Sequence, residues 1–190
     1  MRTTAFWALH LLLLCPAAAF AQQSAHQACV KQAIVQMDGK FTVSGKAIDE
    51  TGTLAPFEDK YEVVESKQGI LDYYVAGKKV GTWTLSNDKY TFVIYDDGGR
   101  EIGPFDVGIQ CHVTAPLAHR LTEQWTAVQK EGEPTWEYLQ ERRVQDHLVE
   151  TDVLVRAKDA PEPPVLVSST VARKVAPPAD SPSGPEETQP

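Results

Sequence analysis

The first half of the chain alternates apolar and polar positions over short runs. Between positions 29 and 111, runs of β-branched and aromatic residues are separated by turn residues at short intervals. A period of two is typical of a strand that buries one face. In residues 59–66, for example, Tyr61 and Val63 share one face and Val64 lies on the other. Short connections favour antiparallel neighbours, so the pattern predicts an antiparallel meander of five to seven strands.

The period changes after Cys111, and a helical pattern starts at Pro116. Residues 116–132 open with Pro116 and close with Gly132, which are typical residues for the two ends of a helix. The apolar side chains between them recur at helical spacing, at Leu117, Leu121, Trp125 and Val128. Residues 134–148 carry a rougher stripe of the same kind. We therefore predict one or two helices packed on the sheet, which makes the fold α+β.

The last part of the chain divides into two segments. Residues 149–157 alternate again, which favours a strand over the fraying end of the second helix. Residues 159–190 hold eight of the thirteen prolines and no aromatic residue, so they bury too little apolar surface to offset their ordering entropy. Within them, residues 165–175 are β-prone and are a candidate edge strand. We predict a domain over residues 22–158, followed by a Pro-rich acidic tail, mostly disordered.

The N-terminus has the features of a secretory signal peptide. Arg2 precedes an apolar run at 5–14, which is too short to span a bilayer, and Ala19 and Ala21 form a small-residue cleavage site. We predict removal of residues 1–21 and a periplasmic or secreted bacterial protein with no membrane span. In the alternative, Cys15 is a lipid-anchored first residue, but the leucine before it and the proline after it do not fit such a site.

Charge and cysteine content narrow the partners and the compartment. The chain has 26 acidic and 18 basic residues, for a formal net charge of −8. That balance argues against nucleic acid, whose phosphates require clustered Lys and Arg, and favours a protein or glycan of the cell envelope. After processing, Cys29 and Cys111 remain, and in an exported chain they predict a disulfide. The alternative is two separate free thiols.

One stretch resembles a known repeat. Residues 74–102 carry an aromatic strand, then G-K-x-x-G-x-W, then Y-D-x-x-G-x-x-I, on Tyr74, Gly77, Lys78, Gly81, Trp83, Tyr95, Asp96, Gly99 and Ile102. This is similar to a single copy of the MORN-variant hairpin repeat, with eleven residues between Trp83 and Tyr95 where the repeat leaves only a few. The G-x-W before a strand is also similar to lipocalin-like barrels. Both resemblances imply β-hairpins and a binding or scaffolding role.

Two adjacent acids, Asp96 and Asp97, are the first candidates for chemistry. A calcium loop needs more oxygens on alternate residues, and an acid–base pair needs carboxylates that converge across a cleft. The Asp-Gly-Gly sequence at 97–99 instead favours the bend of a hairpin. The histidines lack metal-ligand spacing, and no nucleophile or phosphate-loop motif occurs, so we predict no metal and no cofactor. An enzyme would have to unite distant groups, such as Asp72, Asp96 or Glu101 with His112.

Aromatic residues are the better functional lead. Tyr73 and Tyr74 are adjacent on an expected strand, so they point to opposite faces, and one of them leaves the core unless the helices cover that face. We take Tyr73, Tyr74, Trp83 and Tyr95 as a candidate binding surface, since exposed Tyr and Trp are typical of recognition surfaces.

These observations favour an exported non-enzymatic binding protein. It would be an envelope accessory factor or an inhibitor of a secreted enzyme. The alternatives are a carrier of small apolar ligands in a lipocalin-like barrel and an envelope hydrolase.

Overall fold

The chain forms a ten-stranded barrel and a short helix. The computed structural model describes residues 25–49, 51–86, 89–128 and 135–176. The expected signal peptide and the end of the expected tail lie outside these ranges. The strands are β1 (Gly39–Ile48), β2 (Leu54–Lys67), β3 (Ile70–Val75), β4 (Lys78–Ser86), β5 (Lys89–Tyr95), β6 (Glu101–Ala115), β7 (Ala118–Val128), β8 (Thr135–Gln145), β9 (Leu148–Ala157) and β10 (Val165–Lys174).

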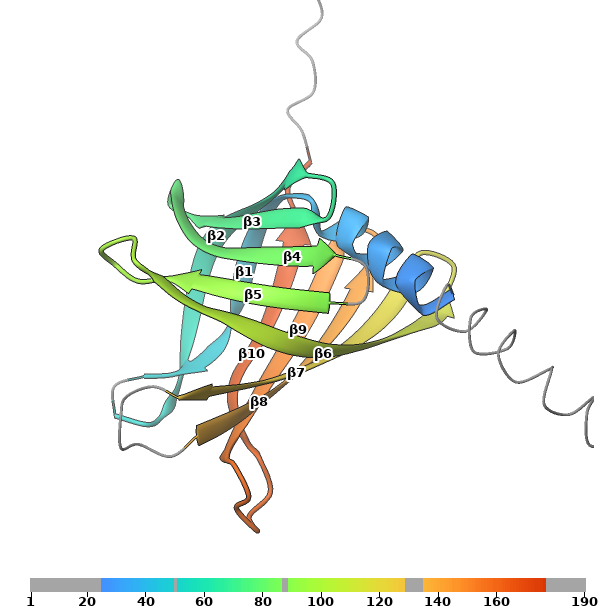
Figure 1. Cartoon of the computed structure of the whole chain (residues 1–190). Coiled ribbons are helices and arrows are strands. Elements are labelled where there is room, and N and C mark those ends of the chain that lie inside the picture. Colours follow the sequence, from blue (N-terminus) through green and yellow to red (C-terminus); the bar gives the residue numbers. More distant parts are fainter. Residues whose placement is uncertain (1–24, 50, 87–88, 129–134, 177–190) are drawn as a thin grey trace, which may run out of the picture.

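Each strand pairs antiparallel with the next strand along the chain (Figure 1). β10 then pairs with β1, from Phe41 opposite Lys174 to Ala47 opposite Ser168, and this pairing closes the barrel. Closure leaves no strand edge of the described sheet unpaired. The predicted strand at 149–157 is confirmed as β9. The candidate strand at 165–175 is β10, which lies between two neighbours rather than at an edge.

The predicted α+β fold is wrong, because both expected helices are strands. β7 and β8 occupy the segments at 116–132 and 134–148. Leu121 and Trp125 are four residues apart, and an even spacing keeps residues on one face of a strand as well as close together on a helix. Pro116 lies in the β6–β7 turn, where Leu117 takes a positive φ of 59°.

The hairpin bend predicted at 97–99 is confirmed between β5 and β6. The Gly99 N–H donates to the Asp96 carbonyl at 2.8 Å, and Gly99 has a φ of 79°, which favours glycine. The Asp96 carboxylate accepts the Arg100 backbone N–H at 2.9 Å and the Arg100 Nε–H at 3.0 Å. The backbone bond from Arg100 is the main reason that the pKa of Asp96 is lowered. These contacts hold the turn together.

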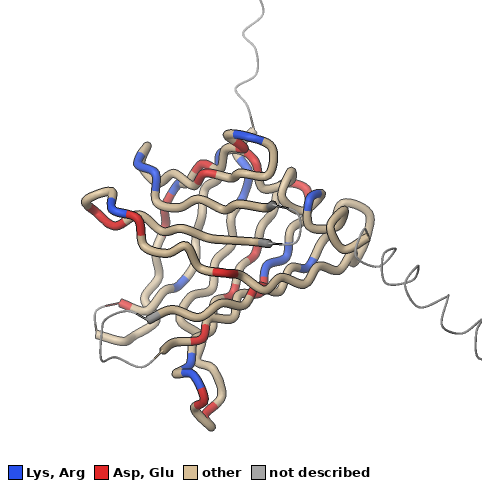
Figure 2. Tube along the Cα trace, in the orientation of Figure 1, with Lys and Arg blue, Asp and Glu red and all other residues tan. Residues whose placement is uncertain are grey.

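The outer face of the barrel carries charges of both signs. Acidic and basic positions interleave along the strands (Figure 2). Several form ion pairs between neighbouring strands: Lys40–Glu62, Asp72–Lys79, Arg120–Glu141, Arg143–Glu150 and Glu137–Arg156. The exposed ones among them each contribute little to stability, whereas the Asp72 carboxylate is buried. Among the described residues, no helix combines the length and apolar character that a bilayer crossing requires.

The helix covers residues 25–37, where the sequence suggested only a short lead-in and the start of the β region. Its buried side chains recur at helical spacing and join the core of the barrel: Cys29, Val30, Ala33, Ile34 and Met37. The helix lies across one end of the barrel, close to the turns that join β2 to β3 and β6 to β7 (Figure 1). It therefore closes that end, which we call the helix end.

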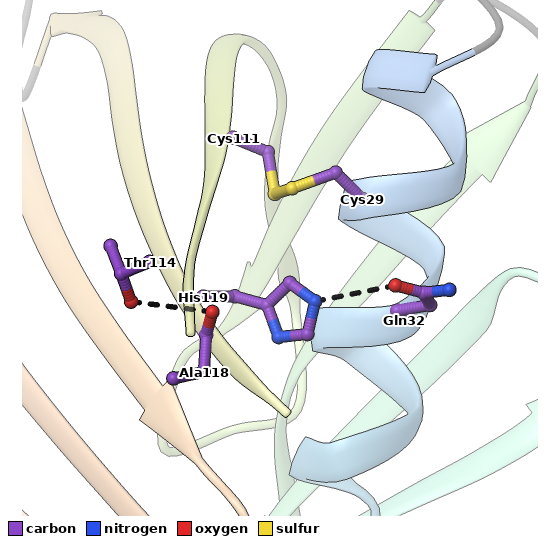
Figure 3. The surroundings of a disulfide bond; sticks show 6 residues. All are labelled: Cys29, Gln32, Cys111, Thr114, Ala118 and His119. Carbon is purple, nitrogen blue, oxygen red and sulfur yellow. Dashed lines mark hydrogen bonds between the residues drawn. A yellow bond between two sulfur atoms is a disulfide. The ribbon is translucent and has the colours of Figure 1, made fainter. Parts of the chain in front are cut away.

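A disulfide fastens the helix to the barrel wall. Cys29 is bonded to Cys111 of β6, which confirms the predicted bridge (Figure 3). Beside it, His119 of β7 is only 3% exposed, and its Nε2 lies 3.4 Å from Oε1 of Gln32 on the helix. Burial lowers the pKa of His119. The helix is thus held by a covalent bond, a polar contact and an apolar stripe.

Candidate functional site

The barrel interior is packed at the helix end and open to solvent at the other. Residues paired across an antiparallel ladder share a face, so the register traces the inner face from strand to strand. Near the helix, Val107 and Cys111 of β6 are 6% and 9% exposed. Toward the other end, Ile94 is paired with Gly81 and Ile102, and the two isoleucines are 36% and 41% exposed. This gradient identifies the far end as a mouth.

A cavity of about 60 Å³ lies within the barrel. It is lined by four aromatic residues, one valine and three polar residues: Tyr73, Trp83, Phe92, Trp125, Val107, Glu123, Gln140 and Arg142. These come from six consecutive strands, β3 to β8. Gly81 makes room for one wall, because a Cβ there would lie 2.9 Å from the Phe92 ring. The Tyr73 and Phe92 rings meet edge to face, with centroids 6.5 Å apart.

A buried ion pair forms the polar part of the cavity. Arg142 Nη2 lies 3.4 Å from Glu123 Oε2, and the two side chains are 11% and 2% exposed. Gln140 Nε2 donates to the same oxygen at 2.6 Å. β7 and β8 position the three residues, because Glu123 is paired with Gln140, and Arg142 lies one inward position further along β8. A carboxylate held by two donors in a dry site is strongly fixed.

Arg142 also connects the ion pair to its surroundings. Its Nη1 donates to the Tyr73 hydroxyl at 3.3 Å and lies 3.0 Å from the Met37 sulfur. Its guanidinium carbon lies 5.9 Å from the centroid of the Trp83 ring, within cation–π range. Met37 ends the helix, so Arg142 links the helix end of the barrel to the aromatic wall.

Two atoms of the ion pair have no hydrogen-bond partner among the described residues. They are Oε1 of Glu123, an acceptor, and Nε of Arg142, a donor, and both are buried. Buried polar atoms in native proteins are nearly always satisfied, by protein, ordered water or ligand. Both residues also line the cavity.

Burial and the neighbouring groups act in opposite directions on the charge of Glu123. Burial raises the pKa of Glu123, and Arg142 and Gln140 oppose that rise. Burial would lower the pKa of Arg142, but Glu123 and the nearby tyrosines outweigh it, and the pKa is raised. A guanidinium keeps its proton in proteins, so a neutral Glu123 would leave a buried cation without a counter-ion. Arg142 therefore favours the carboxylate form of Glu123.

The four aromatic residues of the expected binding surface lie on two faces. Tyr73 and Trp83 face inward and line the cavity. Tyr74 is paired with Lys79 on the outer face, and the Lys79 Nζ lies 5.3 Å from the Tyr95 ring centroid. Tyr73 and Tyr74 thus point to opposite faces, as adjacent strand residues must. The structure does not bring the four into one surface.

The acids considered for an enzyme lie on the outside of the barrel. Asp72 is buried there. Its Oδ1 lies 2.7 Å from the Lys79 Nζ and accepts a hydrogen bond from the Thr82 hydroxyl at 2.8 Å. Glu101 accepts a 3.3 Å hydrogen bond from Tyr95, and Asp96 lies in the β5–β6 bend. The fourth group, His112, is exposed further along β6. Across the described ranges, no three His, Cys, Asp or Glu side chains are placed to hold a metal ion.

Sequence reasoning missed Glu123, Gln140 and Arg142. All three lie in the segments that were expected to be helical, where they count as solvated positions. The available signal was the even spacing of Glu123 from Leu121 and Trp125, which places a carboxylate on the apolar face of a strand. That signal has meaning only after the segment is identified as β.

Similarity to known proteins was found in structure and not in sequence. No protein-family model and no curated protein matches the sequence. Among solved structures, the chain is similar to Rv2717c from M. tuberculosis at 15% identity and a TM-score of 0.49, over 76% of this chain and 96% of that one.

Proposed function

We propose that this chain is an exported, non-enzymatic binding protein that holds a small ligand inside its barrel. One observation carries the proposal. The Glu123–Arg142 pair and Gln140 lie beside four aromatic residues around a cavity, in a barrel whose far end is open. Ligand sites in proteins are typically concave and mostly apolar, with a few polar groups that fix orientation.

The size of the cavity limits how the ligand lies. At about 60 Å³ the cavity is several times smaller than a typical small-molecule site of roughly 300–1,000 Å³. Only the head group of a ligand fits beside the ion pair. The body would lie nearer the mouth, where Trp125 and Tyr138 stack with ring centroids 5.2 Å apart and Ile94 and Ile102 are exposed. The ligand is thus expected to be amphipathic, with its polar end innermost.

The contacts of Glu123 favour binding over acid–base catalysis. A general base must exchange its proton near the working pH. Glu123 pairs with Arg142 and accepts a hydrogen bond from Gln140, so its protonation would break a buried ion pair. Export is supported by the Cys29–Cys111 bridge, because disulfides persist in oxidising compartments. A protein or glycan partner in the envelope remains a prediction.

A fluorescent probe tests the proposal. The neutral, apolar N-phenyl-1-naphthylamine should bind the mature protein saturably and quench tryptophan emission, since Trp83 and Trp125 line the cavity. Val107→Phe, which fills the cavity, should abolish binding while the barrel stays folded by circular dichroism. Val113→Phe is the matched control, because Val113 lies on the same strand and is 60% exposed. Absence of binding, or equal binding by both variants, would contradict the proposal.

A further inference from the structure

Three leucines lie side by side on the outer face of β8, β9 and β10. Leu154 is paired with Leu139 on one side and with Leu166 on the other. Residues paired across a ladder share a face, so the three point the same way. Leu139 directly precedes Gln140, which lines the cavity, so Leu139 and its two partners face outward.

The same row continues on β1 and β2. Ile48 is paired with Leu54, and it lies an odd number of positions from the buried Val43, which places it on the outer face. The ladder between β1 and β10 sets Ala47 opposite Ser168, so Ile48 lies next to the bulge near the start of β10. We call these five aliphatic residues the outer row: Leu139, Leu154, Leu166, Ile48 and Leu54.

The outer row interrupts a surface that is otherwise polar. Ile48, Leu54 and Leu166 are 40%, 38% and 36% exposed. The neighbouring row toward the helix has four polar residues and one proline across the same strands: Glu141, Asp152, Ser169, Lys46 and Pro56. On the other side of the outer row, Glu137 and Arg156 form a 2.7 Å ion pair. Adjacent exposed apolar side chains of this kind mark an interaction surface.

The outer row lies along the rim of the mouth. The turns that join β1 to β2 and β9 to β10 are at the end of the barrel away from the helix (Figure 1). Ile48 and Leu54 flank the first turn, and Leu154 and Leu166 lie near the second. Neighbouring strands are about 4.8 Å apart, so a row across five strands extends about 20 Å. A surface that contacts the outer row therefore also faces the mouth.

The chemistry of the outer row fits a lipid surface better than a protein. All of its members are aliphatic, whereas Trp, Tyr and Arg dominate binding between proteins. Five partly buried side chains also expose far less area than the roughly 800 Å² that each partner of a stable protein interface buries. Shallow insertion of aliphatic side chains at the boundary between headgroups and acyl chains needs no matching groove.

The charges beside the outer row specify the kind of lipid. In the two flanking rows, three acids, Glu137, Glu141 and Asp152, outnumber two bases, Lys46 and Arg156. Anionic lipids attract clusters of Lys and Arg, and these rows instead carry a net negative charge. The surface therefore fits lipids without net charge.

We propose that the mouth end of the barrel docks on a bilayer of zwitterionic lipids through the outer row. This inference rests on the proposed function, since the bilayer is then the source of the ligand. An amphipathic molecule in a bilayer directs its polar end toward water. A mouth placed on that surface receives the polar end first, which is the order in which the proposed ligand lies in the barrel.

Co-sedimentation of the mature protein with phosphatidylcholine vesicles tests the inference. We expect the wild-type protein to bind, and Leu54→Thr to weaken binding about threefold, because it removes part of the inserted apolar area. Adding Ile48→Thr should bring the loss to about tenfold. Threonine is a good strand former, and circular dichroism checks that the variants fold.

Val64→Thr is the matched control. Val64 lies on the outer face of the same strand as Leu54 and is 37% exposed, but it is paired with Asp72 toward the helix end. Its replacement should leave vesicle binding unchanged. Equal binding by Leu54→Thr and Val64→Thr would overturn the inference.

Two further results would also overturn it. One is tighter binding when a quarter of the lipid is phosphatidylglycerol, because the surface would then select anionic lipids. The other is a wild-type dimer in the absence of lipid that Leu54→Thr dissociates, because the outer row would then be an interface between two copies of the chain.

Failure of this inference can be distinguished from failure of the proposed function. If the naphthylamine binds and the vesicles do not, the docking inference is wrong and the carrier function stands. If the vesicles bind through the outer row and the naphthylamine does not bind, the bilayer contact stands and the carrier function is wrong.

Discussion

At the scale of single residues, the two faces of β7 and β8 place their charged side chains in different surroundings. Glu123 and Arg142 are charged groups inside an apolar core, and such pairs require that their desolvation be offset by good contacts. Most outward charges, in contrast, are partly exposed, so replacing one of them should change the free energy of unfolding little. The stability of the protein should therefore respond very differently to charge removal on the two faces of the same strands.

Removing one partner of the buried pair should be strongly destabilising. Arg142→Gln leaves Glu123 as an uncompensated buried charge, with an expected loss of about 3–5 kcal/mol in the free energy of unfolding. Arg120→Gln, on the outer face of β7, should cost about 1 kcal/mol or less. Urea denaturation measures both.

The paired replacement Glu123→Leu with Arg142→Met should recover most of that loss, because it removes both charges. Equal effects of Arg142→Gln and Arg120→Gln would show that the pair is not buried in solution.

Tyr61 supplies a second residue-scale prediction, in the alkaline range. Burial raises the pKa of Tyr61 to about 12, and its ring stacks on Phe41 with centroids 5.1 Å apart. The unfolded value is about 10, so the folded state favours the protonated form. This contribution is fully present below about pH 10 and is lost as the pH rises toward 12, up to about 2–3 kcal/mol.

A titration of phenolate absorbance should show one late step that Tyr61→Phe removes. Tyr74→Phe, on the outer face, should leave that step in place. If Tyr74→Phe removes the late step instead, the step belongs to Tyr74 on the outer face and the prediction for Tyr61 is wrong.

At the scale of elements, the type of an element can be predicted only where a single hydrophobic period, that of a strand or that of a helix, fits the sequence. In β1–β6 the alternation is unambiguous, and the antiparallel meander and the 97–99 bend follow from it. In β7, spacings of four fit both a strand and a helix. Pro116 and Gly132 favour the helix, because these residue types are typical of helix ends. The helix at 25–37 was missed because its stripe begins at Cys29, where the β region was expected to start. The site could not be predicted, since its polar residues lie in the two misassigned strands.

The helix offers a matched test of its role as the cover of one barrel end. Val30 is fully buried and Val35 is 55% exposed, although both lie on the same helix. Val30→Ala should lower the free energy of unfolding by about 1.5–3 kcal/mol, the value of burying one such side chain, and Val35→Ala should change it little. Thermal or urea unfolding gives the difference. Similar small effects would mean that the helix does not pack on the barrel.

At the scale of the whole molecule, the pairing of β10 with β1 closes the barrel. β10 pairs with both β9 and β1, so without it the barrel becomes an open sheet with two unpaired edges. Open edges of this length invite pairing between chains. Closure of the barrel thus depends on β10.

A truncation series tests this dependence. A chain that stops after Ala160 lacks β10 and should aggregate or lose cooperative unfolding. A chain that stops after Ala176 keeps every described strand and should remain monomeric and cooperative. Size-exclusion chromatography with a denaturation curve distinguishes the two. A soluble, cooperative product from the shorter chain would show that closure by β10 is dispensable.

The pairing of Phe41 with Lys174 has one more consequence. The start of β1 and the end of β10 lie side by side, and the Val175 N–H donates to the Lys40 carbonyl at 2.8 Å. The strand order is therefore circular. The chain could begin at another connection between strands without changing which strands are neighbours. A circular permutant that begins near Pro161, with a flexible linker from residue 176 to residue 25, keeps every strand neighbour. Its helix becomes an internal segment, and the new ends lie at the mouth, where a reporter domain can be attached beside the entrance used by the ligand.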